Sequence, residues 1–573
     1  MMNNKNILIL SHPFPGHIRP KVELVEKLSQ SLTISNITIL NSKMGLLSDS
    51  RMKKWHSKLN ISESERKIHV SLMESKDVFF TQVEDFEEFH REMSKMIDMD
   101  ILDQFKFTFD RMMIPYERLM ISKLEIVEVW KESGEIENVI SFEERLQKLS
   151  KIAKPGIKRY LRIRNDPSQT LFDQAVIDFT LISIQSIIAG SKIPCTKIFT
   201  AFFRQFMLHY PGIIANSLDY FTKYPNRFYM PFVAIQDVFY AKAFMENLGE
   251  YFEMNEIIAS DSQCALIQTS SYGFEFASGN TQYFNAHLVG PFMNEKQIND
   301  EIETLRKLAH SNDSSSGMGD LFNWIDEQED IMLMVLGSTM VLDENGMKKL
   351  LEGLQITLNE NPRISILMAL GNLNMEIFER LSFHDLFKTN SKRFKILKGF
   401  VPQKGLLSLE KVKIFFTHCG ANSVNEALYF GKLLIGFPFA YDQMRVSHAI
   451  EEFKVGRSIY HSKKESSDWN INSISKAVHE LLYDEQTSDK YKTAARHAKA
   501  LTRRSGGVSR AAEIVELVSE VDGDLSWGVA DKHLTWWQFY CLDIILFYGI
   551  IIYFTIKMSK LICCYSKSKQ KNE

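Results

Sequence analysis

Cysteine is scarce in this sequence, because only six occur among 573 residues. They are scattered apart from the adjacent Cys563 and Cys564, and no two are spaced as a CxxC pair. The spacing therefore predicts neither a disulfide framework nor a zinc or redox site. The cysteine content leaves the cellular compartment open.

Net charge is also small, since 68 Lys and Arg residues face 71 Asp and Glu residues, for a formal charge of -3. No basic excess favours a nucleic-acid partner, and none is expected. The length, together with 45% hydrophobic residues, predicts at least two domains with sizeable cores.

Long apolar runs are absent except near the C-terminus. The N-terminal run, residues 7–10, is too short for the roughly 7–15-residue apolar core of a signal peptide, so no cleavable signal is expected. The uncharged run Ile544–Ile556 follows an aromatic segment and precedes Lys557 and Lys560. This pattern predicts a single transmembrane helix over residues 541–562, with a buried C-terminal helix as the alternative.

The tail over residues 563–573 is rich in lysine and ends in KQKNE, a pattern of dilysine retrieval signals of the endoplasmic reticulum. The positive-inside rule predicts that the tail lies in the cytoplasm and that the large N-terminal body lies on the other side of the membrane. A single-pass membrane protein of the endoplasmic reticulum is expected. Without a visible signal peptide, the side occupied by the body stays open.

Short buried strands alternate with helical segments in both halves of the chain. The predicted strands are Asn6–Leu10, Ile37–Leu40, Ala175–Ile177, Thr196–Phe199, Ala265–Ile267, Ile331–Leu336, Ile364–Leu370, Val412–Phe416 and Leu433–Phe437. A first helix is predicted over residues 21–30 and helical excursions over 52–164. This rhythm is typical of parallel sheets covered on both faces, and it predicts an α/β fold with two doubly wound, Rossmann-like domains.

The domain boundaries follow from composition. We expect an N-terminal domain over residues 1–292, a polar linker over 293–320 and a second domain over 321–525. A juxtamembrane segment over 526–540, the transmembrane helix over 541–562 and the basic tail over 563–573 complete the chain. In folds of this kind ligands bind beyond the carboxyl ends of the strands, but no GxGxxG or P-loop motif follows any strand, so neither NAD nor P-loop binding is supported.

The segment 400–443 carries the strongest chemical pattern. A strand ends before His418, and a helix is expected near Asn422, so that free backbone N–H groups and the helix dipole form a site for a diphosphate. Ser423 adds a hydroxyl donor, and Glu426, four residues after Asn422, suits a ribose diol. Asp442 and Gln443 follow the next strand and suit sugar hydroxyls.

The segment resembles the signature of the UDP-glycosyltransferase family, which includes animal UDP-glucuronosyltransferases and plant glucosyltransferases. Order and spacing match at Pro402-Gln403, His418-Cys419-Gly420, Asn422-Ser423, Glu426, Pro438 and Asp442-Gln443. Phe400 stands in place of the Trp that stacks on uracil, and Ala421 in place of a second Trp that animal members also lack. The resemblance extends over nearly the whole chain and implies the GT-B architecture, in which two Rossmann-like domains face a cleft.

The resemblance also implies roles for individual residues. Gln403 would contact the uracil or ribose, Glu426 the ribose, and Asp442 with Gln443 the transferred sugar. The diphosphate would lie near the strand-end pair Ser338-Thr339 and the block that contains His418, Gly420, Asn422 and Ser423.

An acid–base pair is expected beyond the strands of the first domain. Glycosyl transfer to a hydroxyl needs a base, and His17, in the loop after the first strand, matches the GHxxP-type histidine that serves as the base in the family. His12 is the competing histidine. Asp178, which follows the apolar run 175–177, would orient His17 from the far side of its ring, with Asp173 as the alternative.

The expected reaction is an inverting, single-displacement transfer of a hexosyl group from UDP-glucose or UDP-glucuronate to a hydroxyl of a small lipophilic acceptor. No metal and no other cofactor is required, because the DxD patterns at Asp98 and Asp522 lie in sequence typical of protein surface. A ceramide or sterol glycosyltransferase and a catalytically silent binder are the alternatives. The donor sugar, the acceptor and any homo-oligomer stay open.

Overall fold

The structure is a computed structural model of the full chain. It describes residues 5–57, 62–73, 172–181, 194–200, 264–271, 286–310, 319–337, 341–381, 392–399, 401–439, 442–459, 470–525 and 542–570, apart from residues 48 and 63, together with residues 116, 120, 184 and 185. The chain divides into two units, Met1–Gly523 and Asp524–Glu573, and each is described by itself.

Among the described residues, the first sheet of the larger unit has seven strands, all paired in parallel, in the order β3-β2-β1-β4-β5-β6-β7. The strands are β1 (Lys5–Leu10), β2 (Ile34–Ser42), β3 (Ile68–Met73), β4 (Gln174–Asp178), β5 (Cys195–Phe199), β6 (Ala265–Gln268) and β7 (Ala286–Leu288). The central strand β4 is buried along its whole length, as expected for a sheet covered on both faces.

In the part of the second half that the structure describes, the second sheet has six strands, again all parallel, in the order β10-β9-β8-β11-β12-β13. The strands are β8 (Asp330–Val335), β9 (Ile364–Leu370), β10 (Phe394–Lys398), β11 (Val412–Thr417), β12 (Leu433–Gly436) and β13 (Gly456–Ser458). Both sheets turn back at their first strand, because β1 lies between β2 and β4, and β8 lies between β9 and β11. Such a reversal is where ligands bind in doubly wound folds.

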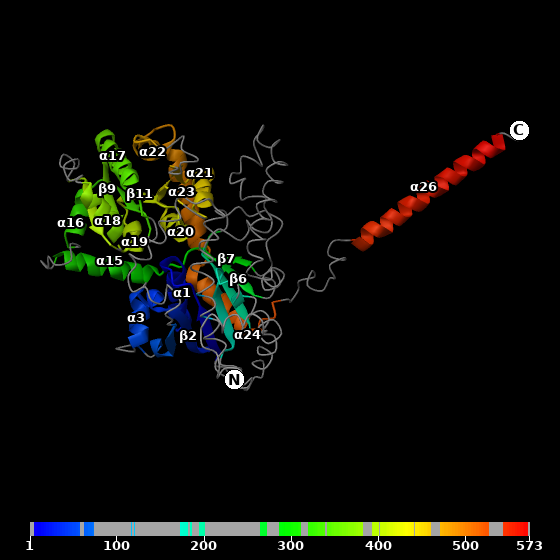
Figure 1. The fold of residues 1–573 in the computed structure, drawn as a ribbon, viewed down its shortest axis with the longest axis horizontal. Coiled ribbons are helices and arrows are strands. Elements are labelled where there is room, and N and C mark those ends of the chain that lie inside the picture. Colours follow the sequence, from blue (N-terminus) through cyan, green and yellow to red (C-terminus); the bar gives the residue numbers. More distant parts are fainter. Residues whose placement is uncertain are drawn as a thin grey trace, which may run out of the picture. The chain divides into compact units, whose positions relative to one another are not determined.

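Helices connect the strands (Figure 1). In the first half they are α1 (Pro15–Leu28), α2 (Lys43–Leu47), α3 (Ser50–Ser57) and the 3₁₀ turn η1 (Glu65–Lys67). In the second half they are α15 (Glu295–His310), α16 (Gly319–Glu327), α17 (Glu344–Glu360), α18 (Asn372–Arg380), α19 (Gln403–Ser408), α20 (Ala421–Phe430), α21 (Gln443–Glu452), α22 (Ser473–Leu482), α23 (Ser488–Arg504) and α24 (Gly507–Glu520).

Side chains of the second sheet alternate between two apolar cores. In β8, Met332 and Met334 pack on one face together with residues of α17 and α22, whereas Ile331 and Leu333 pack on the other face with residues of α16, α19 and α20. All four side chains are fully buried. Successive side chains of a strand point to opposite faces, and both faces of this sheet are covered by helices. The strand is therefore apolar at every position and not only at alternate positions.

These observations confirm the α/β fold with two doubly wound, Rossmann-like sheets. The domain organisation has two features that the sequence did not indicate. The segment assigned to a linker contains the 16-residue helix α15. Helix α24, assigned to the second domain, packs against α1 and against β4, β5 and β6 of the first sheet, and Figure 1 shows it in orange beside α1 and β6.

The structure contains a disulfide that the spacing of the cysteines did not indicate. Cys195 and Cys264 form a disulfide, with 4.7 Å between their Cα atoms. The two residues are 69 positions apart in the sequence, but β5 and β6 are neighbours in the sheet, and Thr196 pairs with Ala265. Parallel pairing therefore brings the beginnings of these two strands together, which the spacing of cysteines along the chain does not reveal.

The smaller unit contains helix α26 (Leu542–Gln570), so the C-terminal apolar run does form a helix. The prediction that it spans a membrane is not supported, because no helix among the described residues is both long enough and apolar enough to cross one. The physical reason lies in the sequence, where the uncharged run ends at Ile556 and Lys557 and Lys560 follow directly.

Candidate active site

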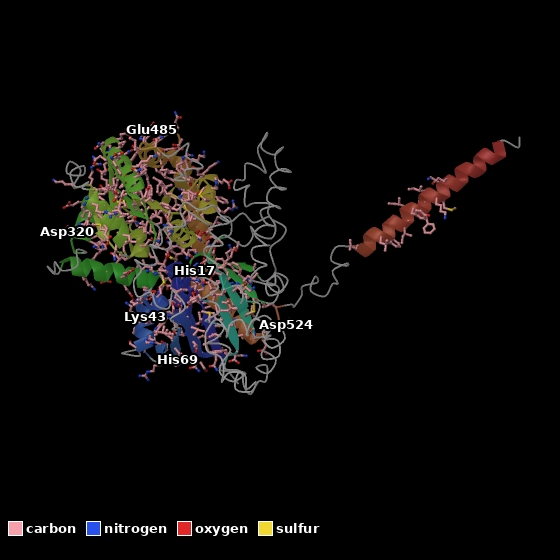
Figure 2. The ribbon with its side chains drawn as sticks, viewed as in Figure 1. His17, Lys43, His69, Asp320, Glu485 and Asp524 are labelled. Atoms are coloured by element: carbon pink, nitrogen blue, oxygen red, sulfur yellow. A yellow bond between two sulfur atoms is a disulfide. The ribbon has the colours of Figure 1, made fainter. Side chains whose placement is uncertain are left out.

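His17 and Asp178 meet at the carboxyl edge of the first sheet. Asp178 is the last residue of β4, which pairs with β1 through Leu10 and Ile177, and His17 lies in the first turn of α1, the helix that follows β1 (Figure 2). His17 Nδ1 is 3.1 Å from both carboxylate oxygens of Asp178. An ionised carboxylate only accepts hydrogen bonds, so Nδ1 carries a proton, and in the neutral form of the ring Nε2 has the lone pair. Nε2 is thus the atom available as a base.

The Asp178 carboxylate is buried and fully engaged. Its Oδ1 accepts hydrogen bonds from the backbone N–H and the hydroxyl of Thr180, at 3.0 and 2.7 Å, and its Oδ2 accepts one from Lys21. Burial would raise the pKa of Asp178, but the charge of Lys21, together with the hydrogen bond from His17, outweighs burial and holds this pKa well below the usual range. The orienting carboxylate is therefore ionised at neutral pH.

Two sequence details of this region differ from expectation. Helix α1 begins at Pro15, not at residue 21, so His17 lies on a helix rather than in a loop. Proline at the first helical positions is favourable, which explains the early start. Asp173, the alternative carboxylate, lies before β4 and accepts a hydrogen bond from the backbone N–H of Asn6. The structure therefore brings Asp178, and not Asp173, to His17.

Helix α20 begins directly after β11, where the sequence predicts a phosphate-binding element. β11 ends at Thr417, and α20 starts at Ala421 after Gly420, with no side chain capping its first turn. His418 lies between these elements, and burial lowers its pKa to about 4, so its ring is neutral at pH 7. The first turn of this 10-residue helix has backbone N–H groups without intrahelical partners. These groups and the neutral imidazole follow the end of β11, a combination suited to an anion.

Gly337, which follows β8, makes room for the His418 ring. It has a φ of +80°, and a Cβ atom added there would lie 2.4 Å from His418 Cε1. We expect Gly337→Ala to displace the ring and to raise the Kd for UDP about tenfold or more, because the backbone conformation also disfavours any side chain. Calorimetric titration with UDP measures this change.

The matched control for this change is Gly371→Ala. Gly371 follows the neighbouring strand β9, has a negative φ and has nothing within 4 Å of an added Cβ atom. Its Kd for UDP should stay at the wild-type value. Equal UDP affinity in wild type and Gly337→Ala would mean that the position of His418 does not govern donor binding.

Gln403, Ser423 and Glu426 form one polar cluster beside the start of α20. Gln403 Nε2 donates hydrogen bonds to Glu426 Oε2 at 2.7 Å and to Ser423 Oγ at 3.2 Å. Gln403 is the first residue of α19, whereas the other two lie on α20. The three residues that the sequence assigned to the uracil, ribose and diphosphate are therefore neighbours in space.

Asp442 and Gln443 lie at the start of α21, which follows β12. Gln443 Oε1 accepts a hydrogen bond from the backbone N–H of Phe439, which fixes the amide group. Burial raises the pKa of Asp442 to about 6, although the nearby His17 acts in the opposite direction. The electrostatic effect of His17 on Asp442 indicates that the predicted base and the predicted sugar contact lie in the same region.

A hydrogen bond joins the two halves of the site directly. Asn422 Nδ2 donates to the backbone carbonyl of Gly16 at 2.7 Å. In a regular helix this carbonyl would accept from the residue four positions later, but that residue is Pro20, which has no N–H. The proline three residues after His17 thus leaves a carbonyl free to bind the donor-site helix α20.

Some predicted residues lie outside the described part of the chain. These are Ser338, Thr339 and Phe400 of the donor site and Asp98 of the first DxD pattern. Asp522, from the second pattern, is exposed and forms an ion pair with Lys5, as expected for a surface carboxylate.

Comparisons with known proteins show what this chain is similar to. The sequence profile of the family described as UDP-glucoronosyl and UDP-glucosyl transferase matches residues 359–572, which include the whole donor-site segment from 401 to 443. Residues 359–572 are therefore similar in sequence to the UDP-glycosyltransferase family.

Two curated members illustrate the similarity. A putative UDP-glucuronosyltransferase, ugt-48, of Caenorhabditis elegans is 28% identical over 206 residues, which cover 35% of this chain and 37% of that protein. Human UDP-glucuronosyltransferase 2B28 is 28% identical over 185 residues, covering 32% of this chain and 33% of that protein. The matched region thus spans about a third of the length of these relatives.

Solved structures of UDP-glycosyltransferases share the fold over most of the chain. Os79 of O. sativa, in complex with U2F and trichothecene, has a TM-score of 0.55 at 16% identity and covers 90% of this chain and 99% of its own. UGT2 of Phytolacca americana, complexed with UDP-2fluoro-glucose and pterostilbene, has a TM-score of 0.53 at 15% identity and covers 91% and 99%. This similarity establishes a GT-B-like arrangement of parallel sheets.

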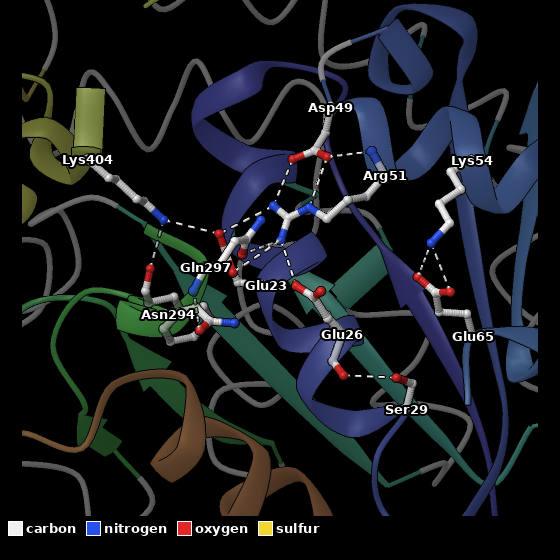
Figure 3. A network of polar contacts seen from close by, with 11 residues as sticks. Glu23, Glu26, Ser29, Asp49, Arg51, Lys54, Glu65, Asn294, Gln297 and Lys404 are labelled. Carbon is white, nitrogen blue, oxygen red and sulfur yellow. Dashed lines mark hydrogen bonds and ion pairs between the residues drawn. The ribbon is translucent and has the colours of Figure 1, made fainter. Parts of the chain in front are cut away.

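An ion cluster joins the helix of the predicted base to the helix of Gln403. Arg51 forms ion pairs with Glu23 and Glu26 of α1 and with Asp49, and Glu23 also pairs with Lys404 of α19 (Figure 3). The side chains of Glu23 and Asp49 are only 8% and 10% exposed. No sequence motif indicates this cluster, because its members are distant in the chain and each is an ordinary surface residue type.

The cluster predicts a pH-dependent stability. Burial would raise the pKa values of Glu23 and Asp49, but their cationic partners, Lys404 and Arg51 for Glu23 and Arg51 for Asp49, lower both overall. Carboxyls with lowered pKa values stabilise the folded state above their unfolded pKa of about 4 and lose this contribution as the pH falls through the folded values. Arg51→Met should cost about 2 kcal/mol at pH 7 and progressively less toward pH 3.

Chemical denaturation of Arg51→Met at several pH values measures this cost, and Arg66→Met, at an exposed arginine of η1, is the control. The free energy of unfolding of the control should equal that of wild type at every pH. A cost that stays constant from pH 7 to pH 3 would show that Arg51 stabilises the fold by packing and not by its charge.

Proposed function

We propose that the protein transfers a hexosyl group from UDP-glucose or UDP-glucuronate to a hydroxyl of a small lipophilic acceptor. The observation that carries the proposal is the contact between the His17–Asp178 pair and the donor-site helix α20, through Gly16 and Asn422. Similarity to the family supports a UDP-sugar donor, and UDP is bound in a structure of the neighbour Os79.

In the proposed reaction, Nε2 of His17 takes the acceptor proton while the acceptor oxygen attacks the anomeric carbon. The bond between that carbon and the β-phosphate oxygen breaks, and UDP leaves with the electron pair toward the N-terminus of α20. The ionised Asp178 stabilises the imidazolium that forms. The helix N-terminus and His418 stabilise the diphosphate, so the proposal requires no metal, and the single displacement inverts the anomeric configuration.

The test uses the full-length protein with four UDP-sugars (glucose, glucuronate, galactose and N-acetylglucosamine) and a panel of phenols, sterols and ceramide. UDP release, the mass of the glycoside and its anomeric configuration by NMR are measured. A product of inverted configuration supports the proposal and identifies the donor. UDP binding without any product would favour a catalytically silent member of the family, and a product of retained configuration would contradict the single displacement.

We further propose that the larger unit folds in an oxidising compartment such as the endoplasmic reticulum. The disulfide between Cys195 and Cys264 supports this location, because such bonds are rare in the cytosol. Alkylation of cell lysates without reduction, followed by mass spectrometry, tests it. Free, alkylated Cys195 and Cys264 in protein taken directly from cells would contradict the location.

A further inference from the structure

Lys21 is a cation inside the candidate active site. Its side chain is 1% exposed, and its ammonium group contacts Asp178 Oδ2. Lysine is almost never fully buried unless it is paired, and here the partner is the carboxylate that also binds His17. Lys21 lies four positions after His17 on α1, so that both side chains project from one face of the helix.

This arrangement changes the charge balance of the acid–base pair. A carboxylate alone beside a histidine carries one negative charge, which the imidazolium neutralises when it forms. With Lys21 present, the pair Lys21–Asp178 is already neutral, and protonation of His17 adds a net positive charge to a buried cluster. The ammonium therefore opposes the protonation that the carboxylate favours.

We propose that Lys21 is a positioning residue that holds the Asp178 carboxylate against His17 and offsets its charge, so that His17 stays neutral and competent as a base at mildly acidic pH. The proposal rests on the proposed function of His17 and adds a third member to its pair. Thr180 completes the cluster by fixing Asp178 Oδ1, while Lys21 fixes Oδ2.

The other described groups around His17 do not supply a positive charge in place of the Lys21 ammonium. His12 is fully buried, and burial, together with His17, lowers its pKa well below the usual range, so it is neutral. Tyr116, packed against His12, has its pKa raised by burial and is also neutral. Among the described residues, the charged or titratable groups around His17 and its partner are Lys21 on α1, His12 after β1, Tyr116, Asp178 on β4 and Asp442 before α21.

The first test is the pH profile of kcat/KM for Lys21→Met. Removing the ammonium leaves the carboxylate unopposed, so the acid-side midpoint of the profile should rise by about one pH unit or more. The control is Lys27→Met, at an exposed lysine of the same helix, which should keep the wild-type profile. A purely structural Lys21 would lower the yield or stability of the variant but would leave the midpoint in place, and this result would overturn the proposal. Lys21→Gln serves as a second neutral variant.

The second test needs no turnover and therefore separates this proposal from the proposed function. Diethyl pyrocarbonate modifies neutral histidines, and mass spectrometry measures the modification of His17 against pH, with the exposed His56 in the same sample as reference. In wild type, His17 should reach half-maximal reaction at a pH no higher than His56 does. In Lys21→Met the value for His17 alone should rise by about one pH unit or more.

The wild-type measurement of this second test also tests the role of Lys21 if no Lys21 variant folds. A half-maximal pH in wild type about one unit or more above that of His56 would show an unopposed carboxylate and would overturn the proposal. If the wild type makes no glycoside but His17 responds as expected, the charge balance holds and the proposed reaction fails.

Discussion

His17→Ala should lower kcat about 10²- to 10⁴-fold while the Kd for UDP stays within about twofold of wild type. The side chain is 21% exposed and its ring is held by Asp178, so its removal deprives the acceptor hydroxyl of a base without opening the core. Glycoside formation by mass spectrometry and UDP titration by calorimetry measure the two effects separately. The separation is expected because the residues predicted to contact the donor lie on α19, on α20 and at the start of α21, and not on α1.

The control for this variant is His56→Ala, at an exposed histidine of α3 in the same domain. It should keep the wild-type kcat. Turnover of His17→Ala within about threefold of wild type would remove His17 from the mechanism, because a general base contributes far more than that. Loss of UDP affinity in the same variant would instead indicate that the first turn of α1 supports the donor site through Gly16 and Asn422.

The inner strands of both sheets could be predicted from the sequence, whereas the edge strands could not. The nine predicted strands correspond to β1, β2, β4, β5, β6, β8, β9, β11 and β12, which are the inner strands of the two sheets. The strands without a prediction, β3, β7, β10 and β13, are the four edge strands. An edge strand is covered less completely, so it does not need the continuous apolar run that identifies a buried parallel strand.

The contact between His17 and Asp178 could be predicted for the same topological reason. His17 follows β1 and Asp178 ends β4, and these strands are neighbours, so the carboxyl ends of both lie at one edge of the sheet. Asp173 has the same chemistry but lies before the strand, at the opposite edge. The direction of β4 therefore distinguishes Asp178 from Asp173, although the two side chains are chemically identical.

Lys21 could not be predicted, because a lysine on a helix is by default a solvated side chain. The signal for it is the spacing of four residues from His17, and this spacing matters only once α1 is known to begin at Pro15. The same limit applies to the disulfide and to the Arg51 cluster. Each depends on which distant segments become neighbours, which local sequence patterns do not specify.

Asp178→Asn should have two large effects, because Asp178 serves both His17 and Lys21. The amide cannot neutralise the buried ammonium, so the free energy of unfolding should fall by about 3 kcal/mol, as for other buried ion pairs from which one partner is removed. The amide can also donate to Nδ1 and so favour the wrong histidine tautomer, which should lower kcat about 10⁴-fold. Denaturation and glycoside formation measure these effects on the same preparation.

The double variant Lys21→Met/Asp178→Asn separates the two roles. It removes both charges together, so most of the lost stability should return, because a neutral side chain replaces the unpaired ammonium. Its kcat should stay low, since nothing holds His17 in the productive tautomer. Asp173→Asn is the control and should keep the wild-type kcat. If the double variant were as unstable as Asp178→Asn alone, the loss would come from the hydrogen bonds of Thr180 to the carboxylate and not from the charge of Lys21.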